Sequence, residues 1–544
     1  MKIELYDTTL RDGCQMDGIS FSLQDKIAIA RIMDNLEISY IEGGWPSSNP
    51  KDELFFKEIK KERLKSSKIV AFGSTAHPKY KPDEDLNLQG LIDAKTEIIT
   101  IFGKTSPFHI KNVLRVSLDR NLEIVEGSIK FLRKKGKRVF FDCEHFFDGY
   151  KDNPKYAKRV IEVAINGGCE IAILCDTNGG SYPEEIEKII KELKTNFPLG
   201  IHTHNDRELA VANSISAVMA GCRQVQGTMN GYGERCGNAN LITLIPNLYK
   251  LGILTIKEEK LKSLTETSRI ISEIANIAHS PHQPYVGQSA FAHKAGVHSS
   301  AVMKHPETYE HINPELVGNT RKMIVSELAG TSSIIHKASE YQISFSKEET
   351  KKVLKIVKEM ENQGYQFEAA DGSFELLIDK ALGLYKPSFN IKEYGVIVEN
   401  EGGRLTSKAT VKIEVEGKEE YTVAEGDGPV NALDKAIRKA LYPFYPELLG
   451  VHLTDYKVRV LDTKEGTAAK VRVLIESSDK KGSWGTVGVS ENIIDASCHA
   501  LIDAIEYALL KRKEAYIANT NKTNQAEKGS LAGVKKSRLI INNT

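Results

Sequence analysis

The sequence predicts an α/β protein: a (β/α)₈ TIM barrel, then a helical linker region and a duplicated α+β domain. Short apolar segments alternate with amphipathic ones through about the first 250 residues, the usual length of such a barrel. These segments show little polar alternation, as in parallel strands covered on both faces. Polar residues gather where they end, and a later stretch of the chain repeats its own pattern. An open, doubly wound sheet is the alternative architecture.

The expected elements of the barrel follow one another along the chain. The expected strands cover residues 3–7, 39–43, 69–72, 98–102, 138–142, 171–175, 200–204 and 224–228. The clearest helices between them cover residues 23–36, 154–166, 184–194 and 208–220, where apolar residues recur at helical intervals. This alternation assigns residues 1–256 to the catalytic barrel.

The remaining chain divides into three expected regions. Residues 257–388 are mostly helical, with a candidate helix at 346–363, and form linker subdomains that complete the active site. Residues 389–515 contain two alternating stretches, 409–415 and 469–475, each followed by another strand and a helix. Val411 corresponds to Val471, and Ala432 to Ala496, which indicates a duplicated βββα unit. The polar tail at 516–544 is expected to be disordered.

Composition excludes several classes of protein. Lys and Arg total 74 against 73 Asp and Glu, so the net charge of +1 argues against a nucleic-acid-binding protein. The short basic run at 535–538 is the one feature in favour of nucleic acid, and such a run is more often a solvated terminus. No uncharged apolar stretch approaches the roughly 18 residues of a membrane span. Charges at Lys2, Glu4 and Asp7 argue against a secretory signal. Seven cysteines without a C-x-x-C pair predict a cytoplasmic protein.

The clearest metal signal is His202-Thr203-His204 at the end of an expected strand. Residues i and i+2 of a strand point to the same face, so both imidazoles can reach one cation. Many isolated triplets of this kind are merely solvated histidines, but here Asp12 offers a nearby carboxylate and Asn238 a further oxygen. Two histidines and a carboxylate with open positions are typical of a catalytic metal site. These ligand types suit Mn²⁺, Mg²⁺, Zn²⁺ or Co²⁺.

Other strand ends carry further candidates. Arg11 beside a metal can hold a substrate oxygen and stabilise negative charge that develops on it, although an Arg-Asp neighbour pair is often only a surface salt bridge. Glu144 can act as a base or orient one, and its alternative is a solvated loop residue. Gly231, Gly233 and Gly237 predict a tight turn close to a ligand. Their spacing does not match a dinucleotide-binding fingerprint.

Three separated motifs resemble one known family. LYDTTLRDGCQ, HTHNDRELAVANS and GTMNGYGERCGNANL occur in the order found in the isopropylmalate synthase and homocitrate synthase family of acyl-CoA Claisen-condensing enzymes. YIEGGWPSSNPKD and FFDCEHFFDGYKDNP are most similar to its long-form, citramalate-forming branch. The resemblance covers residues 1–513, because the duplicated region resembles the family's allosteric domain.

The resemblance implies roles for individual residues. Arg11 would contact the keto acid and stabilise the developing alkoxide. Glu144 and Thr177 would lie beside the substrate, Glu144 in a catalytic role and Thr177 near the carboxylate. In AFAHKAGVHSSAVMKHPETYEH, His298 and Tyr309 match residues of acid–base catalysis that reach into a barrel, that of the partner subunit. The implied metal ligands are Asp12, His202, His204 and Asn238.

One residue departs from part of the family pattern. Arg321 stands where the leucine-pathway branch has a catalytic tyrosine, which argues against a simple isopropylmalate synthase and leaves that role to Tyr309. His293 is a weaker alternative to His298.

The implied reaction joins acetyl-CoA to pyruvate and hydrolyses the thioester, giving (R)-citramalate and CoA for isoleucine biosynthesis. The duplicated domain of the expected homodimer would bind an amino-acid effector, isoleucine, and its alternative is a plain dimerisation domain. Isopropylmalate or homocitrate synthesis, with another keto acid, is the alternative within the family.

Two other classes fit less well. Related carbon–carbon lyases usually lack the duplicated domain. A metabolite sensor without catalysis would be expected to lose site residues, whereas Arg11, Asp12, His202 and His204 are all present.

Overall fold

The structure, a computed structural model, describes residues 3–294, 296–324, 346–461, 469–480 and 482–511. Internal contacts divide the chain into one unit of Met1–Ala292 with Glu310–Lys322 and another of His293–Tyr309 with Met323–Thr544. The tail at 516–544, including the basic run, lies outside the described residues. None of the helices in the described ranges has the length and apolar character needed to cross a bilayer.

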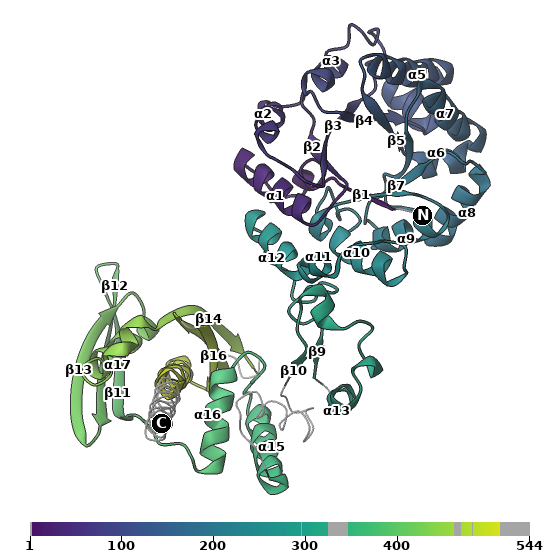
Figure 1. The fold of residues 1–544 in the computed structure, drawn as a ribbon. Helices are drawn as coiled ribbons and strands as arrows, with labels where there is room; N and C mark the ends of the chain where they lie inside the picture. Colours follow the sequence, from purple (N-terminus) through teal and green to yellow (C-terminus); the bar gives the residue numbers. More distant parts are fainter. Residues whose placement is uncertain (1–2, 295, 325–345, 462–468, 481, 512–544) are drawn as a thin grey trace, which may run out of the picture. The chain divides into compact units, whose positions relative to one another are not determined.

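The first unit contains a closed barrel of eight parallel strands in sequential order, which confirms the predicted fold class (Figure 1). The ring closes where β1 pairs with β8, from Glu4 opposite Gln224 to Asp7 opposite Gly227. This closure excludes the open-sheet alternative. The strands are β1 Glu4–Asp7, β2 Tyr40–Gly44, β3 Lys68–Ser74, β4 Ile98–Lys104, β5 Arg138–Glu144, β6 Ile171–Asp176, β7 Leu199–Thr203 and β8 Gln224–Gly227.

Helices lie around the outside of the strands (Figure 1). Helix α9 begins at Ala210, two residues later than predicted, because Glu208 adopts a left-handed φ of 60° and the Asn205 side chain accepts the Ala210 N–H. The helices are α1 Leu23–Asn35, α2 Pro50–Glu58, α3 Leu86–Asp93, α4 Pro107–His109, α5 Leu118–Lys134, α6 Phe146–Asp152, α7 Pro154–Gly167, α8 Pro183–Leu193, α9 Ala210–Met219, α10 Leu241–Lys250, α11 Glu258–Lys262 and α12 Leu264–Ile274.

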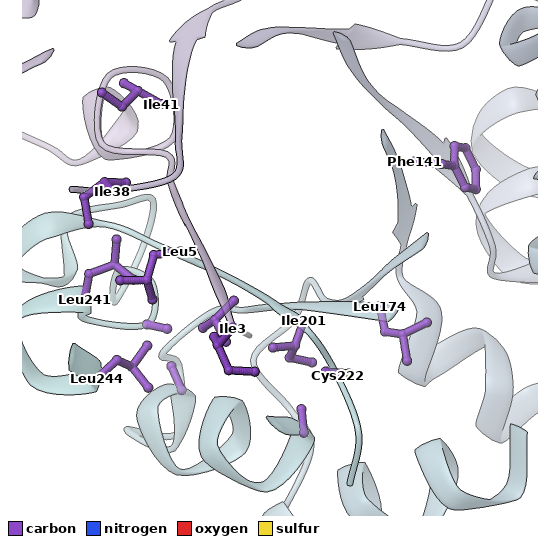
Figure 2. Close-up of a cluster of buried hydrophobic side chains, with 14 of the residues drawn as sticks. Ile3, Leu5, Ile38, Ile41, Phe141, Leu174, Ile201, Cys222, Leu241 and Leu244 are labelled. Atoms are coloured by element: carbon purple, nitrogen blue, oxygen red, sulfur yellow. The ribbon is translucent and has the colours of Figure 1, made fainter. Parts of the chain in front are cut away.

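Successive strand residues point alternately out of and into the barrel. Figure 2 shows the outward set, including Leu5, Ile41 and Phe141, which packs with helix residues such as Leu241. The inward set begins with an apolar layer and becomes polar two residues further along several strands. The apolar layer contains Tyr6, Tyr40, Val70, Ile98, Phe140, Ile171, Ile173 and Cys175. The polar residues that follow on their strands are Glu42, Thr100 and Asp142, each buried.

A buried ion pair fixes the loop that follows β2. Lys26 of α1 pairs with Asp52 of α2 and also donates to the carbonyl oxygen of Gly43 at 3.0 Å. Asp52 in turn accepts the backbone N–H of Trp45 at 2.9 Å. Gly44 has a φ of +138°, and a Cβ there would lie 2.4 Å from an Asp52 oxygen. Only glycine therefore fits at position 44. The ion pair and its hydrogen bonds hold the end of β2 in place.

The second unit contains helices and two antiparallel sheets. Buried residues such as Val353, Val357 and Phe374 join α15 and α16 into an apolar core. The elements are α13 Gly296–Lys304, α15 Lys347–Asn362, α16 Asp371–Leu382, β11 Asn390–Glu401, β12 Arg404–Val415, β13 Lys418–Gly426, α17 Pro429–Leu441, β14 His452–Val460, β15 Val471–Asp479, β16 Gly482–Ser490 and a helix at 493–511. Short strands β9 Ala292–His293 and β10 Lys322–Met323 form a separate two-stranded sheet.

The predicted βββα duplication is confirmed. Strands β11, β12 and β13 precede α17, and β14, β15 and β16 precede the helix at 493–511. The two copies share a specific hydrogen bond between sheet and helix. Thr422 Oγ1 donates to the Ala436 carbonyl at 2.8 Å, and Thr486 Oγ1 donates to the Ala500 carbonyl at 2.8 Å. Each pair spans the same sequence separation, so the helix docks on its sheet in the same register in both copies.

Candidate metal centre and substrate site

The loop after β1 places Arg11 and Asp12 at the carboxyl end of the barrel. A tight turn forms because the Thr8 carbonyl accepts the N–H groups of Arg11 at 3.1 Å and Asp12 at 2.8 Å. The Thr9 hydroxyl accepts the backbone N–H of Met229 at 2.8 Å, which ties this loop to the segment after β8. Contacts between loops far apart in sequence therefore fix the position of the arginine and the carboxylate.

Asp12, His202 and His204 form a cluster that fits a divalent cation. Their ligand atoms all lie within 4.8 Å of one another, and all three residues are buried. His202 Nε2 lies 3.4 Å from His204 Nε2 and 3.4 Å from Asp12 Oδ2. Ligands bonded at about 2.1 Å to one ion lie about 3.0–3.4 Å apart. The separations in this cluster therefore match a shared cation.

The electrostatics of the cluster also suit a cation. Burial would raise the pKa of Asp12, but the charge of Arg11 and the neighbouring imidazoles lower this pKa to about 2, so the carboxylate stays ionised. Burial lowers the pKa of His202, and burial together with His202 lowers the pKa of His204 to about 3. Both imidazoles are therefore neutral near pH 7 and keep the lone pairs that a metal requires.

Asn238 lies beside this cluster with unused polar atoms. It pairs with His204 in an isolated β-bridge, and it is close enough to Asp12 to help lower the pKa of that carboxyl. Within the described chain, its buried Oδ1 and Nδ2 and the buried Nδ1 of His204 complete no hydrogen bond. Buried polar groups without partners are rare and commonly mark an ion or water site.

The predicted glycine turn shapes the space around Asn238. Gly237 has a φ of +90°, and a Cβ there would lie 2.1 Å from the Gly231 carbonyl oxygen. A Cβ on Gly233 would lie 2.7 Å from Asn238 Oδ1. Glycine at these positions therefore lets the chain turn tightly and leaves room for the asparagine amide.

Arg11 is held on three sides. Its Nε donates to Glu42 Oε1 at 2.6 Å, an Nη lies 3.3 Å from Asp12, and its guanidinium carbon lies 3.8 Å from the centre of the Phe72 ring. Glu42 also accepts the Tyr6 hydroxyl at 2.6 Å. Burial would lower the pKa of Arg11, but the surrounding carboxylates raise it, so its charge is permanent.

Glu144 and Thr177 lie at the neighbouring ends of β5 and β6. Glu144 forms an ion pair with Lys104 at the end of β4. The Thr177 hydroxyl accepts the backbone N–H of His145 at 2.8 Å, and His145 adopts a left-handed φ of 57°. This bond uses a lone pair of the Thr177 oxygen and leaves the hydroxyl proton able to donate to a ligand.

The two remaining predicted residues belong to the second unit. His298 and Tyr309 stack with ring centroids 4.1 Å apart, and the Tyr309 side chain is exposed. Arg321 forms a two-point ion pair with Glu310 at 2.6 Å for each contact. The barrel itself brings together Arg11, Asp12, His202, His204 and Asn238 at one place.

A layer of buried polar residues, not predicted from the sequence, lies beneath this cluster. Gln226 of β8 contacts His202 at 3.0 Å and Asp142 of β5 at 3.2 Å, while Tyr6 links Glu42 to Thr100. For Glu42, Thr100 and Asp142 the signal was present as a single polar residue two positions after an apolar inward residue. Such residues become informative only once the strand direction and inward face are known.

Three consecutive regions of the chain match known domain families. Residues 2–271 match the HMGL-like family, residues 285–365 the homocitrate synthase post-HMGL domain-like family, and residues 368–509 the LeuA allosteric (dimerisation) domain. Together these regions define a condensing-enzyme barrel of the HMGL type with an allosteric domain.

Curated relatives identify the particular family. An (R)-citramalate synthase of Geobacter sulfurreducens is 54% identical over 94% of this chain and 98% of its own length. One from Aquifex aeolicus is 53% identical over 94% of this chain and 99% of its own length. A 2-isopropylmalate synthase of Methanocaldococcus jannaschii is 33% identical over 94% of this chain and 96% of its own length. The chain belongs to the (R)-citramalate synthase family.

The cluster predicts one divalent cation per barrel. After thorough chelation, we expect the protein to bind one equivalent of Mn²⁺ in a calorimetric titration. Asp12→Ala removes a metal ligand and should weaken Mn²⁺ binding by about 100-fold or more. Loss of only a hydrogen-bond partner of a ligand usually weakens binding by about 10–100-fold. Asp17→Ala, which removes an exposed carboxylate from the same loop, is the control and should bind as the wild type does. Equal affinities for the two variants would contradict this site.

Proposed function

We propose that the protein condenses acetyl-CoA with pyruvate and hydrolyses the thioester, giving (R)-citramalate and CoA. The observation that carries this proposal is the convergence of Arg11 with Asp12, His202 and His204 at the end of a barrel. The choice of pyruvate is supported by 53–54% identity to (R)-citramalate synthases, against 33% for a 2-isopropylmalate synthase.

Asp12, His202, His204 and Asn238 would hold the divalent metal. When bound, such an ion acts as a Lewis acid that polarises a carbonyl and orients its substrate. The ligand set suits Mn²⁺, Mg²⁺, Zn²⁺ or Co²⁺.

Arg11 stabilises the negative charge that develops on the ketone oxygen during carbon–carbon bond formation. Glu42 and Phe72 hold the guanidinium in place before substrate arrives, so little reorganisation is needed in the transition state. Thr177 donates its hydroxyl proton to the keto-acid carboxylate, because its oxygen already accepts the His145 N–H.

Enolate formation requires a base because the methyl group of a thioester is a very weak acid. Glu144, paired with Lys104 at the edge of the site, is one candidate for this step or for orienting the base. His298 and Tyr309 supply acid–base groups from the region 257–388, which completes the active site of the 1–256 barrel. Their ring stacking keeps the two groups together.

A keto-acid panel tests the proposed substrate. Release of CoA thiol from acetyl-CoA should be fastest with pyruvate, and 2-ketobutyrate, 2-ketoisovalerate and 2-oxoglutarate should be slower. A difference of one or two methylenes is worth about 10–200-fold in specificity. A higher kcat/KM with 2-ketoisovalerate or 2-oxoglutarate would reassign the enzyme within its family, and (R)-citramalate should be recovered as the product with pyruvate.

The protein acts as a homodimer in which His298 and Tyr309 serve the barrel of the partner subunit. The match to a dimerisation domain at 368–509 supports this arrangement. Arg11→Ala should lower turnover by about 100–1,000-fold, as for other lost oxyanion donors. Tyr309→Phe should lower turnover by about 100–10,000-fold through lost acid–base catalysis.

Co-expression of these two variants with different tags tests the shared site. A mixed dimer has one intact site, so purified mixed dimers should recover about half the wild-type activity if each subunit serves its partner. No recovery in correctly folded mixed dimers would mean that Tyr309 acts within its own chain.

The duplicated domain at 389–515 binds isoleucine as a feedback effector. The match to an allosteric domain and the two equivalent βββα units support an effector site. In the thiol-release assay, isoleucine should inhibit at concentrations where leucine does not. Deleting residues 389–544 should abolish inhibition, and a lack of response to either amino acid in the full chain would favour a plain dimerisation domain.

The proposed compartment is the cytoplasm. All seven cysteines are free thiols, including the exposed Cys236, which suits a reducing compartment. Cell fractionation with an activity assay tests this location.

A further inference from the structure

Gln226 connects a metal-ligand histidine to a buried carboxyl group. It lies on β8 inside the barrel and is fully buried. Its Oε1 lies 3.0 Å from His202 Nδ1, and its Nε2 donates to Asp142 Oδ1 at 3.2 Å. The amide therefore has a different partner at each end.

These two contacts determine which histidine nitrogen carries the proton. The NH₂ group of Gln226 donates to Asp142 Oδ1, which places the amide oxygen on the His202 side. The amide oxygen then faces His202 and can only accept, which requires a proton on His202 Nδ1. The lone pair of this neutral ring is consequently on Nε2, the nitrogen 3.4 Å from both Asp12 and His204.

We propose that Gln226 is a positioning residue that fixes the Nδ1-protonated tautomer and orientation of His202, so that Nε2 faces the cation site. Metal-binding histidines commonly rely on such a partner for their other nitrogen. The inference rests on the metal site proposed above and is independent of which keto acid the enzyme uses.

The chain provides a matched control for this role. Gln224 lies two residues earlier on β8, faces inward as Gln226 does and is also fully buried. Neither polar atom of its side chain makes a hydrogen bond within the described residues. Methionine is similar in length to glutamine, so each replacement exchanges one buried side chain for another of similar size. Only Gln226→Met removes a contact to His202.

The test measures Mn²⁺ affinity of chelated, substrate-free protein by electron paramagnetic resonance of free Mn²⁺. We expect Gln226→Met to raise the Kd by about 10–100-fold, the usual effect of losing a partner of a metal-ligand histidine. Gln224→Met should stay within about threefold of the wild type. Circular dichroism confirms that each variant is folded.

Equal Kd changes in Gln226→Met and Gln224→Met would show only a packing role and overturn the proposal. A second measurement does not depend on the glutamine variants. Nitrogen-15 NMR of the metal-free wild type, with His202 assigned by loss of its signals in His202→Gln, should show a protonated Nδ1. The opposite tautomer would overturn the proposal. A preference for another keto acid would contradict the proposed function and leave both of these results unchanged.

Discussion

Arg11 lies among several buried carboxyl groups at the carboxyl end of the barrel. Asp12 and Glu42 contact it directly, and Asp142 also contributes to the raised pKa of its guanidinium. Taking one such charge out of water without a partner costs several kcal/mol. The arginine therefore permits a buried aspartate to remain ionised beside two neutral histidines. The same guanidinium is then available for a second task, stabilisation of negative charge on a substrate.

The closed barrel explains why these groups meet. Closure makes every strand present alternate residues to one interior, and the parallel direction brings all carboxyl ends to one side. The apolar layer formed by residues such as Val70 and Phe140 excludes water below the site. Polar residues such as Asp142 and Gln226 then form a buried network directly above it. In this network Gln226 joins the carboxyl group of Asp142 to the imidazole of His202.

Much of the fold followed from sequence because its signals are local. Apolar strand segments, helical periodicity and the repeated βββα pattern each extend over a few residues, and all three predictions were confirmed. The metal cluster was also predictable, since His202 and His204 share one face of a strand and Asp12 lies at another strand end. The start of α9 was misplaced because the left-handed Glu208 and the Asn205 contact leave no periodic signal.

The sequence by itself determined the barrel, the duplicated domain and the kinds of ligand in the candidate site, because these depend on periodicity and on residue type. The tertiary structure decided the partners of those ligands. Glu42 lies beside Arg11, and Gln226 beside His202, only because strands distant in sequence become neighbours or face one another across the interior. Hydrogen-bond pairing between distant segments depends on distances that no local pattern encodes. The protonation of His202 and the orientation of Arg11 are consequently properties of the folded barrel.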